Sequence, residues 1–252
     1  MGLRIMAQID LNADLGEGGD LDEALMSVVT SCNIACGGHA GDDASMRAAL
    51  RLAKQNQVSP GAHPSFPDRE NFGRAASSLS GPALVAELTS QLTALNQIAV
   101  DEGLTLSHLK PHGALYNMAA KDPELADQIT EALLAVIPTA SLVGPPNSEL
   151  KRAAAAQQIE FVAEGFADRA YEADGQLRQR SLSGAVIHDA DAQTKQALQI
   201  ATEKQVTSFD GARLDLPAET LCVHGDTPAA FDAARKIKAA FEQSGISICA
   251  PY

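Results

Sequence analysis

The chain has no tryptophan, and aromatic residues make up only 4% of its 252 residues. Basic residues are also scarce, with 19 Lys and Arg against 32 Asp and Glu, a formal net charge of −13. Nucleic acids and anionic membranes are bound through Lys and Arg, so this balance argues against both as partners. No apolar run approaches the length of a membrane span, and the run at residues 1–7 is too short for a signal peptide. We therefore predict a cytoplasmic protein that binds neither nucleic acid nor membrane.

Cysteine is sparse, and several familiar catalytic motifs are missing. The four cysteines lie in apolar, strand-like surroundings without a C-x-x-C pair, which predicts reduced, buried thiols. They are Cys32, Cys36, Cys222 and Cys249. The chain has no G-x-S-x-G elbow, no P-loop and no Rossmann glycine fingerprint after its first strand. These absences argue against a serine hydrolase of the α/β type and against ATP chemistry on a P-loop.

The sequence repeats one pattern along the chain. A short apolar run is followed by a turn and then by an Ala/Leu/Gln-rich segment with helical period. We predict strands near residues 4–11, 31–36, 58–62, 106–111, 140–143, 159–166, 184–187 and 220–224. We predict helices near residues 44–56, 81–102, 122–136, 147–157, 189–204 and 228–243. This alternation is typical of an α/β protein with a parallel sheet, either closed into a barrel or open and doubly wound. No low-complexity linker divides the chain, so we expect one domain over residues 1–252.

The first strand carries its polar residues on one face. Asp10, Asn12 and Asp14 stand at every second position, so their side chains project together while the intervening apolar residues take the other face. Later apolar runs also end in polar side chains. These are His39, His63, Lys110 with His112, Asp168 with Arg169, and His224. Ligands bind at the carboxyl ends of the strands in α/β proteins, so we predict that these side chains meet in one site.

A lone histidine at a strand end is more often structural than catalytic. Here four of the six histidines follow apolar runs, which favours a common site. Asp42 and Asp226 fit helix caps better than catalysts. Residues 64–80 form a long irregular segment that we interpret as a lid or substrate loop, and residues 171–177 read as a small hairpin.

The residues alone do not decide whether the protein binds a metal ion. Asp14 with two of the histidines would make a two-histidine, one-carboxylate set. His108 and His112 form an H-x-x-x-H pair, but Pro111 disfavours a helix there, and on a strand they would stand about 13 Å apart. We predict no tightly bound metal, while a divalent ion is not excluded.

The chain resembles the LamB/YcsF family. The resemblance rests on the blocks DLNADLGEG (10–18), NIACGGHAGD (33–42), GAHPSFPDRENFG (61–73), HLKPHGALYN (108–117), FADRAY (166–171) and LCVHGD (221–226). These blocks run through nearly the whole chain. The family usually has an aromatic residue where Gly38 stands, so we expect this chain to lack one side chain of the pocket wall.

The resemblance implies an irregular seven-stranded β/α barrel, TIM-like and related to glycoside hydrolases and deacetylases. It also implies the A subunit of a 5-oxoprolinase, which opens the lactam ring of 5-oxo-L-proline to L-glutamate. This hydrolysis would be coupled to ATP, bound through a complex with two other subunits, B and C. The free chain should then be nearly inactive.

The predicted site suits that chemistry. Lys110 can neutralise a phosphate or an oxyanion, and Asp14 or His112 can act as general base on water. A second histidine (His39, His63 or His224) would protonate the departing nitrogen. Asp10 and Asn12 would orient these groups, and Arg169 beside Asp168 would clamp the substrate carboxylate. We expect Asp10 or Asp14 to pair with Lys110, so that Lys110→Met changes stability little.

Two alternatives stay open. A metal-dependent amide or carbohydrate deacetylase would hold a divalent ion and act without partners. A non-catalytic substrate-binding subunit would bind ligand, but mutation of its polar strand ends would not reduce turnover.

Overall fold

A computed structural model describes residues 7–223 and 228–252 of the chain, so the predicted site residue His224 lies outside the described residues. Seven parallel strands pair in the order β1-β2-β3-β4-β5-β6-β9, and β9 pairs back with β1 to close a barrel. The strands are β1 (Gln8–Leu15), β2 (Ser31–Ala35), β3 (Ser59–His63), β4 (His108–Leu109), β5 (Ser141–Gly144), β6 (Phe161–Phe166) and β9 (Thr220–Cys222). The prediction of an irregular seven-stranded β/α barrel is confirmed.

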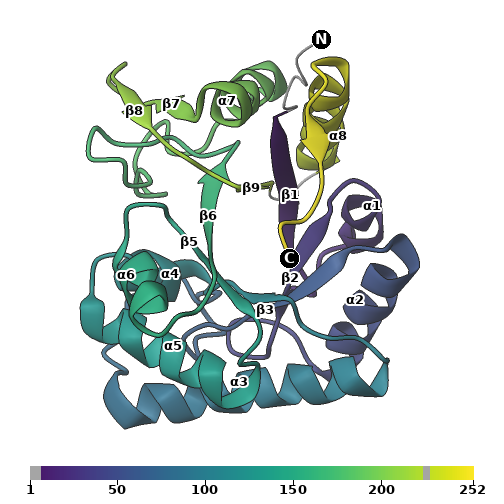
Figure 1. The fold of residues 1–252 in the computed structure, drawn as a ribbon, viewed down its shortest axis with the longest axis vertical. Helices are drawn as coiled ribbons and strands as arrows, with labels where there is room; N and C mark the ends of the chain where they lie inside the picture. Colours follow the sequence, from purple (N-terminus) through teal and green to yellow (C-terminus); the bar gives the residue numbers. More distant parts are fainter. Residues whose placement is uncertain (1–6, 224–227) are drawn as a thin grey trace.

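The helices lie around the outside of this ring of strands (Figure 1). They are α1 (Asp22–Met26), α2 (Asp43–Asn56), α3 (Gly81–Asp101), α4 (Gly113–Ala119), α5 (Pro123–Val136), α6 (Glu149–Ala156), α7 (Ala190–Glu203) and α8 (Pro228–Gln243). Asp42 begins α2 as predicted, because its carboxylate accepts the backbone N–H of Ser45. Among the described residues, no helix combines the length and apolar character needed to cross a membrane.

Three short strands complete the described fold. β7 (Gln205–Thr207) and β8 (Arg213–Asp215) form an antiparallel ribbon that follows α7. β10 (Ser247–Ile248) pairs with the first residues of β1, and the chain then ends near β1 and β2 in the view of Figure 1. None of the three is predicted from the sequence, because each has only two or three residues and leaves no periodic pattern to read.

Two predicted strands need correction. Residues 184–187 form no strand, and only Val186 makes a single bridge, to Arg169. This short apolar run lies in the connection between β6 and α7, where it packs back on the chain instead of entering the barrel. The first strand does not end near residue 11, because β1 runs on to Leu15 while its alternating residues continue to pair with β2.

The barrel interior is polar and fully buried. Asn33 donates to Asn12 at 2.8 Å and accepts from the His108 ring at 2.7 Å, so one network spans β1, β2 and β4. At the amino ends of the strands, Asp10 accepts hydrogen bonds from three hydroxyl groups. These belong to Thr30, Ser31 and Thr220. Burial raises the pKa of Asp10 although these hydroxyls oppose the shift. The polar face of β1 therefore points into the barrel and not into water.

Gly61 on β3 shows how tightly this interior is filled. A Cβ built on Gly61 would overlap the ring of His108, which also stacks on Tyr252 at 4.4 Å between centroids. We expect Gly61→Ala to lower the free energy of unfolding by about 3 kcal/mol, since the ring must move and lose its bond to Asn33. Urea unfolding measures this. Gly19→Ala is the matched control, because a Cβ there meets nothing within 4 Å, and equal unfolding midpoints for the two variants would contradict the prediction.

The four cysteines are all unpaired, as predicted. Cys32, Cys36 and Cys222 are buried, whereas Cys249 is partly exposed. Burial raises the pKa of the Cys36 thiol to about 12, which keeps it protonated and unreactive.

Candidate active site

Five of the predicted site residues meet at the carboxyl ends of the strands. Asp14 ends the inward face of β1, His63 ends β3, and Lys110 and His112 follow the short β4. The carboxylate of Asp14 lies 3.0 Å from Lys110 Nζ and 3.3 Å from His63 Nε2. His63 Nε2 lies 2.9 Å from His112 Nδ1. His39, in the loop between β2 and α2, stacks on His112 with 3.7 Å between ring centroids.

Lys110 is only 2% exposed and is held by several partners. Its ammonium lies 2.8 Å from the Glu164 carboxylate, in addition to its contact with Asp14, and it donates to Asn12 at 3.2 Å. Burial alone would lower the pKa of Lys110, but the carboxylates of Asp14 and Glu164 and the Cys222 sulfur outweigh it, so the pKa stands well above its usual value. The predicted pairing with Asp14 is confirmed. Asp10 does not pair with Lys110, and Glu164 is its second carboxylate partner.

His39 and His112 are neutral bases in this environment. Burial, reinforced by the neighbouring His63, lowers the pKa of His39 to about 3 and that of His112 to about 2. Backbone carbonyls fix two of the rings. His63 Nδ1 lies 2.7 Å from the Lys110 carbonyl, and His112 Nε2 lies 3.0 Å from the Phe72 carbonyl.

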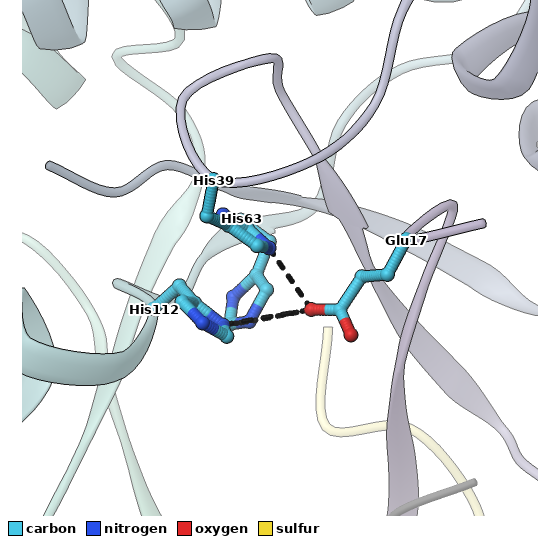
Figure 2. A group of neighbouring side chains, drawn as sticks. All are labelled: Glu17, His39, His63 and His112. Carbon is cyan, nitrogen blue, oxygen red and sulfur yellow. Dashed lines mark hydrogen bonds and ion pairs between the residues drawn. The ribbon is translucent and has the colours of Figure 1, made fainter. Parts of the chain in front are cut away.

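Two acidic residues of this site are missed by sequence reasoning. Glu17 places its Oε1 2.9 Å from His39 Nε2 and 3.5 Å from His112 Nδ1, as Figure 2 shows. Glu164 is buried on β6 and neutralises Lys110. A signal for Glu17 is present in the sequence, because it stands between two glycines directly after the first polar strand. Glu164 stands inside an apolar run, where its partner 54 residues away leaves no local pattern.

The four predicted substrate-binding residues fall into different places. Asn12 accepts a hydrogen bond from Lys110 and so can orient it. Asp10 lies deeper in the barrel, where its carboxylate accepts from three hydroxyl groups. Arg169 lines the cavity above the site and donates to the Arg178 carbonyl at 2.7 Å. Burial and the nearby Arg180 lower the pKa of Arg169 to about 10. Asp168 is buried and its backbone carbonyl accepts from Ile187, so it helps to hold the loop before α7.

This cavity has a volume of about 450 Å³. Asp14, Glu17, His63, Lys110 and His112 are among its lining residues. Among the described residues, six cationic side chains and two carboxylates line it, in a chain whose overall charge is −13. The cationic residues are Arg74, Lys110, Lys121, Arg169, Arg178 and Arg180. The cavity therefore suits an anionic ligand.

Two loops border the cavity. The predicted substrate loop, residues 64–80, contributes Arg74 to the lining and packs the Phe72 ring 5.3 Å from that of His39. The predicted hairpin closes with a bridge between Tyr171 and Leu177, and residues 176–181 also line the cavity. Both loops thus lie where sequence analysis places a ligand.

The effect expected of Gly38 is wrong. A Cβ at this buried glycine would stand 2.5 Å from Ser65 Oγ and 2.6 Å from Gln91 Nε2. The missing side chain therefore faces α3, and its absence alters packing there and not the wall of the cavity.

Comparisons with known proteins agree with this picture. The model of the LamB/YcsF family matches residues 9–252. Proteins named as the A subunit of 5-oxoprolinase from two Haemophilus influenzae strains, PittEE and 86-028NP, are 44% identical to the chain, over 97% of this chain and all of theirs. The crystal structure of a lactam utilization protein from Thermus thermophilus has a TM-score of 0.91 and 39% identity, covering 96% of this chain and 99% of its own.

A more distant likeness concerns the fold alone. A family 4 carbohydrate esterase from Streptomyces lividans, solved with acetate, has a TM-score of 0.50 at 12% identity, over 96% of this chain and 91% of its own. The barrel type predicted from the sequence is thus shared with carbohydrate esterases.

Proposed function

The chain belongs to the LamB/YcsF family, and on that premise we propose that it is the A subunit of an ATP-dependent 5-oxoprolinase. It would open the lactam ring of 5-oxo-L-proline to give L-glutamate. The observation that carries the substrate assignment is the 44% identity, over nearly the whole chain, to relatives named as the A subunit of 5-oxoprolinase. The cavity agrees with it, because its cationic lining suits a small carboxylate.

The hydrolysis needs a nucleophile, a stabilised oxyanion and a proton for the leaving nitrogen. Water adds to the lactam carbonyl carbon, the ring C–N bond breaks, and the nitrogen takes up a proton. An unactivated lactam resists this attack, so ATP would phosphorylate the amide oxygen and release ADP before water adds. A second water would then hydrolyse the phosphorylated carboxylate left by ring opening, giving glutamate and phosphate. ATP would act through the complex with subunits B and C, since this chain has no P-loop.

The residues at the cavity floor can divide these roles. Lys110 would neutralise charge on the carbonyl or phosphoryl oxygen. Asp14, held between Lys110 and His63, would orient water and accept its proton, with His112 as the other base within reach. A neutral histidine can relay that proton toward the ring nitrogen, and the short distance between His63 and His112 offers a path.

The test is an assay of 5-oxoproline-dependent ATP hydrolysis with the purified chain alone and with its candidate partner subunits. We expect turnover only in the mixture, with one glutamate formed per ADP. Robust ATP-coupled turnover by the chain alone would contradict the proposal. The control uses L-proline, which lacks the lactam carbonyl and should stimulate no ATP hydrolysis.

The same preparation separates the two alternatives. A deacetylase would release acetate from acetylated sugars or amides without ATP or partners. A purely substrate-binding subunit would tolerate mutation of the cavity floor with no loss of turnover. Either result would replace the proposed function.

A further inference from the structure

Three histidines and one glutamate aim their ring or carboxylate atoms at a common point beside the cavity. One such atom from each of Glu17, His39, His63 and His112 lies within 4.8 Å of the other three. Figure 2 shows the Glu17 carboxylate facing the edges of the His39 and His112 rings, with His63 beside them. The three rings come from three different loops or strand ends, so local sequence does not bring them together.

The backbone decides which nitrogen of two rings carries hydrogen. A carbonyl oxygen can only accept, so the Lys110 carbonyl requires N–H at His63 Nδ1, and the Phe72 carbonyl requires N–H at His112 Nε2. Unless a second proton is added to either ring, His63 Nε2 and His112 Nδ1 both carry lone pairs. These two atoms lie only 2.9 Å apart and both face Glu17.

Without an added proton, the described side chains bring only electron-rich atoms to this point. Two lone pairs and a carboxylate oxygen repel one another unless a cation lies between them. Fixing the distal nitrogen of a histidine on a backbone carbonyl is how proteins orient metal ligands. A proton between His63 Nε2 and His112 Nδ1 is the other species that would relieve the repulsion.

The distances fit a small ion. Four ligands about 2.0 to 2.1 Å from a tetrahedral zinc ion stand about 3.3 Å from one another. Glu17 Oε1 lies 2.9 Å from His39 Nε2, 3.5 Å from His112 Nδ1 and 3.9 Å from His63 Nε2. These values lie on both sides of the tetrahedral spacing.

We propose that Glu17, His39, His63 and His112 bind one divalent transition-metal ion of the zinc class. Imidazole nitrogens suit Zn²⁺, Co²⁺ and Ni²⁺ better than Mg²⁺ or Ca²⁺, which require oxygen ligands. The parallel rings of His39 and His112 must tilt toward the ion when it binds. With the ion bound, His63 and His112 could not take up the proton of water, and Asp14 would be the base. Sequence analysis predicts no tightly bound metal, so a metal titration decides between that prediction and this proposal.

The test measures metal binding without substrate, partners or ATP, so its outcome does not depend on the proposed function. The full chain is freed of metal with a chelator and titrated with ZnCl₂ by calorimetry, and with CoCl₂ by visible absorption. We expect one Zn²⁺ per chain, a cobalt spectrum of low-symmetry coordination, and a rise in melting temperature with metal.

Two variants remove one ligand each, Glu17→Gln and His112→Asn. Loss of a residue that only hydrogen-bonds a metal ligand lowers metal affinity by up to about 100-fold. Each of these variants removes a ligand itself, so each should lower the Zn²⁺ affinity by more than that. The matched control is His188→Asn, because His188 is exposed and distant in sequence from the group, and its affinity should equal that of the unmodified chain. Melting curves without metal identify any variant that does not fold, and the other variant then decides.

Two results would overturn the proposal. One is an unmodified chain that takes up no Zn²⁺ while NMR finds His63 or His112 as imidazolium, which would assign the central charge to a proton. The other is Zn²⁺ binding that persists in folded Glu17→Gln and His112→Asn but is lost in His188→Asn. That result would place the Zn²⁺ site at the surface, near His188.

Discussion

Lys110→Met should lower turnover of the assembled enzyme by at least about a hundredfold. Methionine keeps the length of the side chain and removes its positive charge. The lost charge is the one nearest to Asp14 at the cavity floor, where an oxyanion or phosphoryl group would develop.

The same change should also destabilise the fold, contrary to the expectation from sequence. Lys110 neutralises Glu164, whose side chain is fully buried. Removing one partner of a buried ion pair leaves an uncompensated charge and costs about 3 to 5 kcal/mol. Sequence analysis expects Asp10 or Asp14 as the partner of Lys110, a carboxylate that can take up water or a proton, and so it predicts little loss.

A second substitution separates stability from chemistry. In the double variant Lys110→Met with Glu164→Gln, both members of the buried pair are neutral, so we expect much of the unfolding free energy to return while turnover stays low. Urea unfolding and the ATP-coupled assay measure the two quantities on the same samples. Lys151→Met, at an exposed position on α6, is the control for the substitution itself. Near-normal turnover in the double variant would remove Lys110 from the mechanism.

Most of the fold can be predicted from the sequence, because helices and strands leave local patterns of apolar residues. Periodicity places six of the helices within two residues or so, since the amphipathic pattern repeats over several turns. The failures are segments without a repeat. Residues 184–187 have the apolar composition of a strand, but the decision between strand and loop depends on a pairing partner that only the tertiary structure supplies.

The candidate site is accessible in part for the same reason. Asp14, Lys110 and His112 stand at ends of apolar runs, and parallel strands bring such ends together. Glu17 is different, because it reaches the histidines through a turn. Gly16 and Gly18 both have positive φ, and the Asp22 carboxylate accepts the Gly16 N–H at 2.8 Å, so the chain reverses over the cavity. Sequence spacing does not reveal the direction of that reversal.

The polar interior raises a further difficulty. Alternating Asp10 and Asn12 on a strand usually indicate a face in water. Their burial, with exposed fractions of 0% and 1%, depends on hydroxyl and amide partners contributed by other strands of the closed barrel. No local feature of the first strand predicts those partners.

Asp14→Asn should lower kcat of the assembled enzyme by about a hundredfold to ten-thousandfold, the range that loss of a general base produces. The amide cannot accept a proton from water, and it also loses the charge that pairs with Lys110. Asparagine has the same shape, and the side chain is 11% exposed, so we expect the fold to persist. Since Asp14 would act on water and not on the substrate carboxylate, KM for 5-oxoproline should change much less than kcat.

Comparison with His112→Asn identifies the base. If Asp14 takes the proton from water, Asp14→Asn has the larger effect on kcat, and the histidine variant retains part of its turnover because His63 still contacts Asp14 at 3.3 Å. Asp20→Asn, at an exposed position shortly after β1, controls for loss of one negative charge near the strand end. A full kcat in Asp14→Asn, together with a large loss in His112→Asn, would assign the base to His112. The carboxylate would then serve only to position Lys110, and the proton path would begin at the histidine pair.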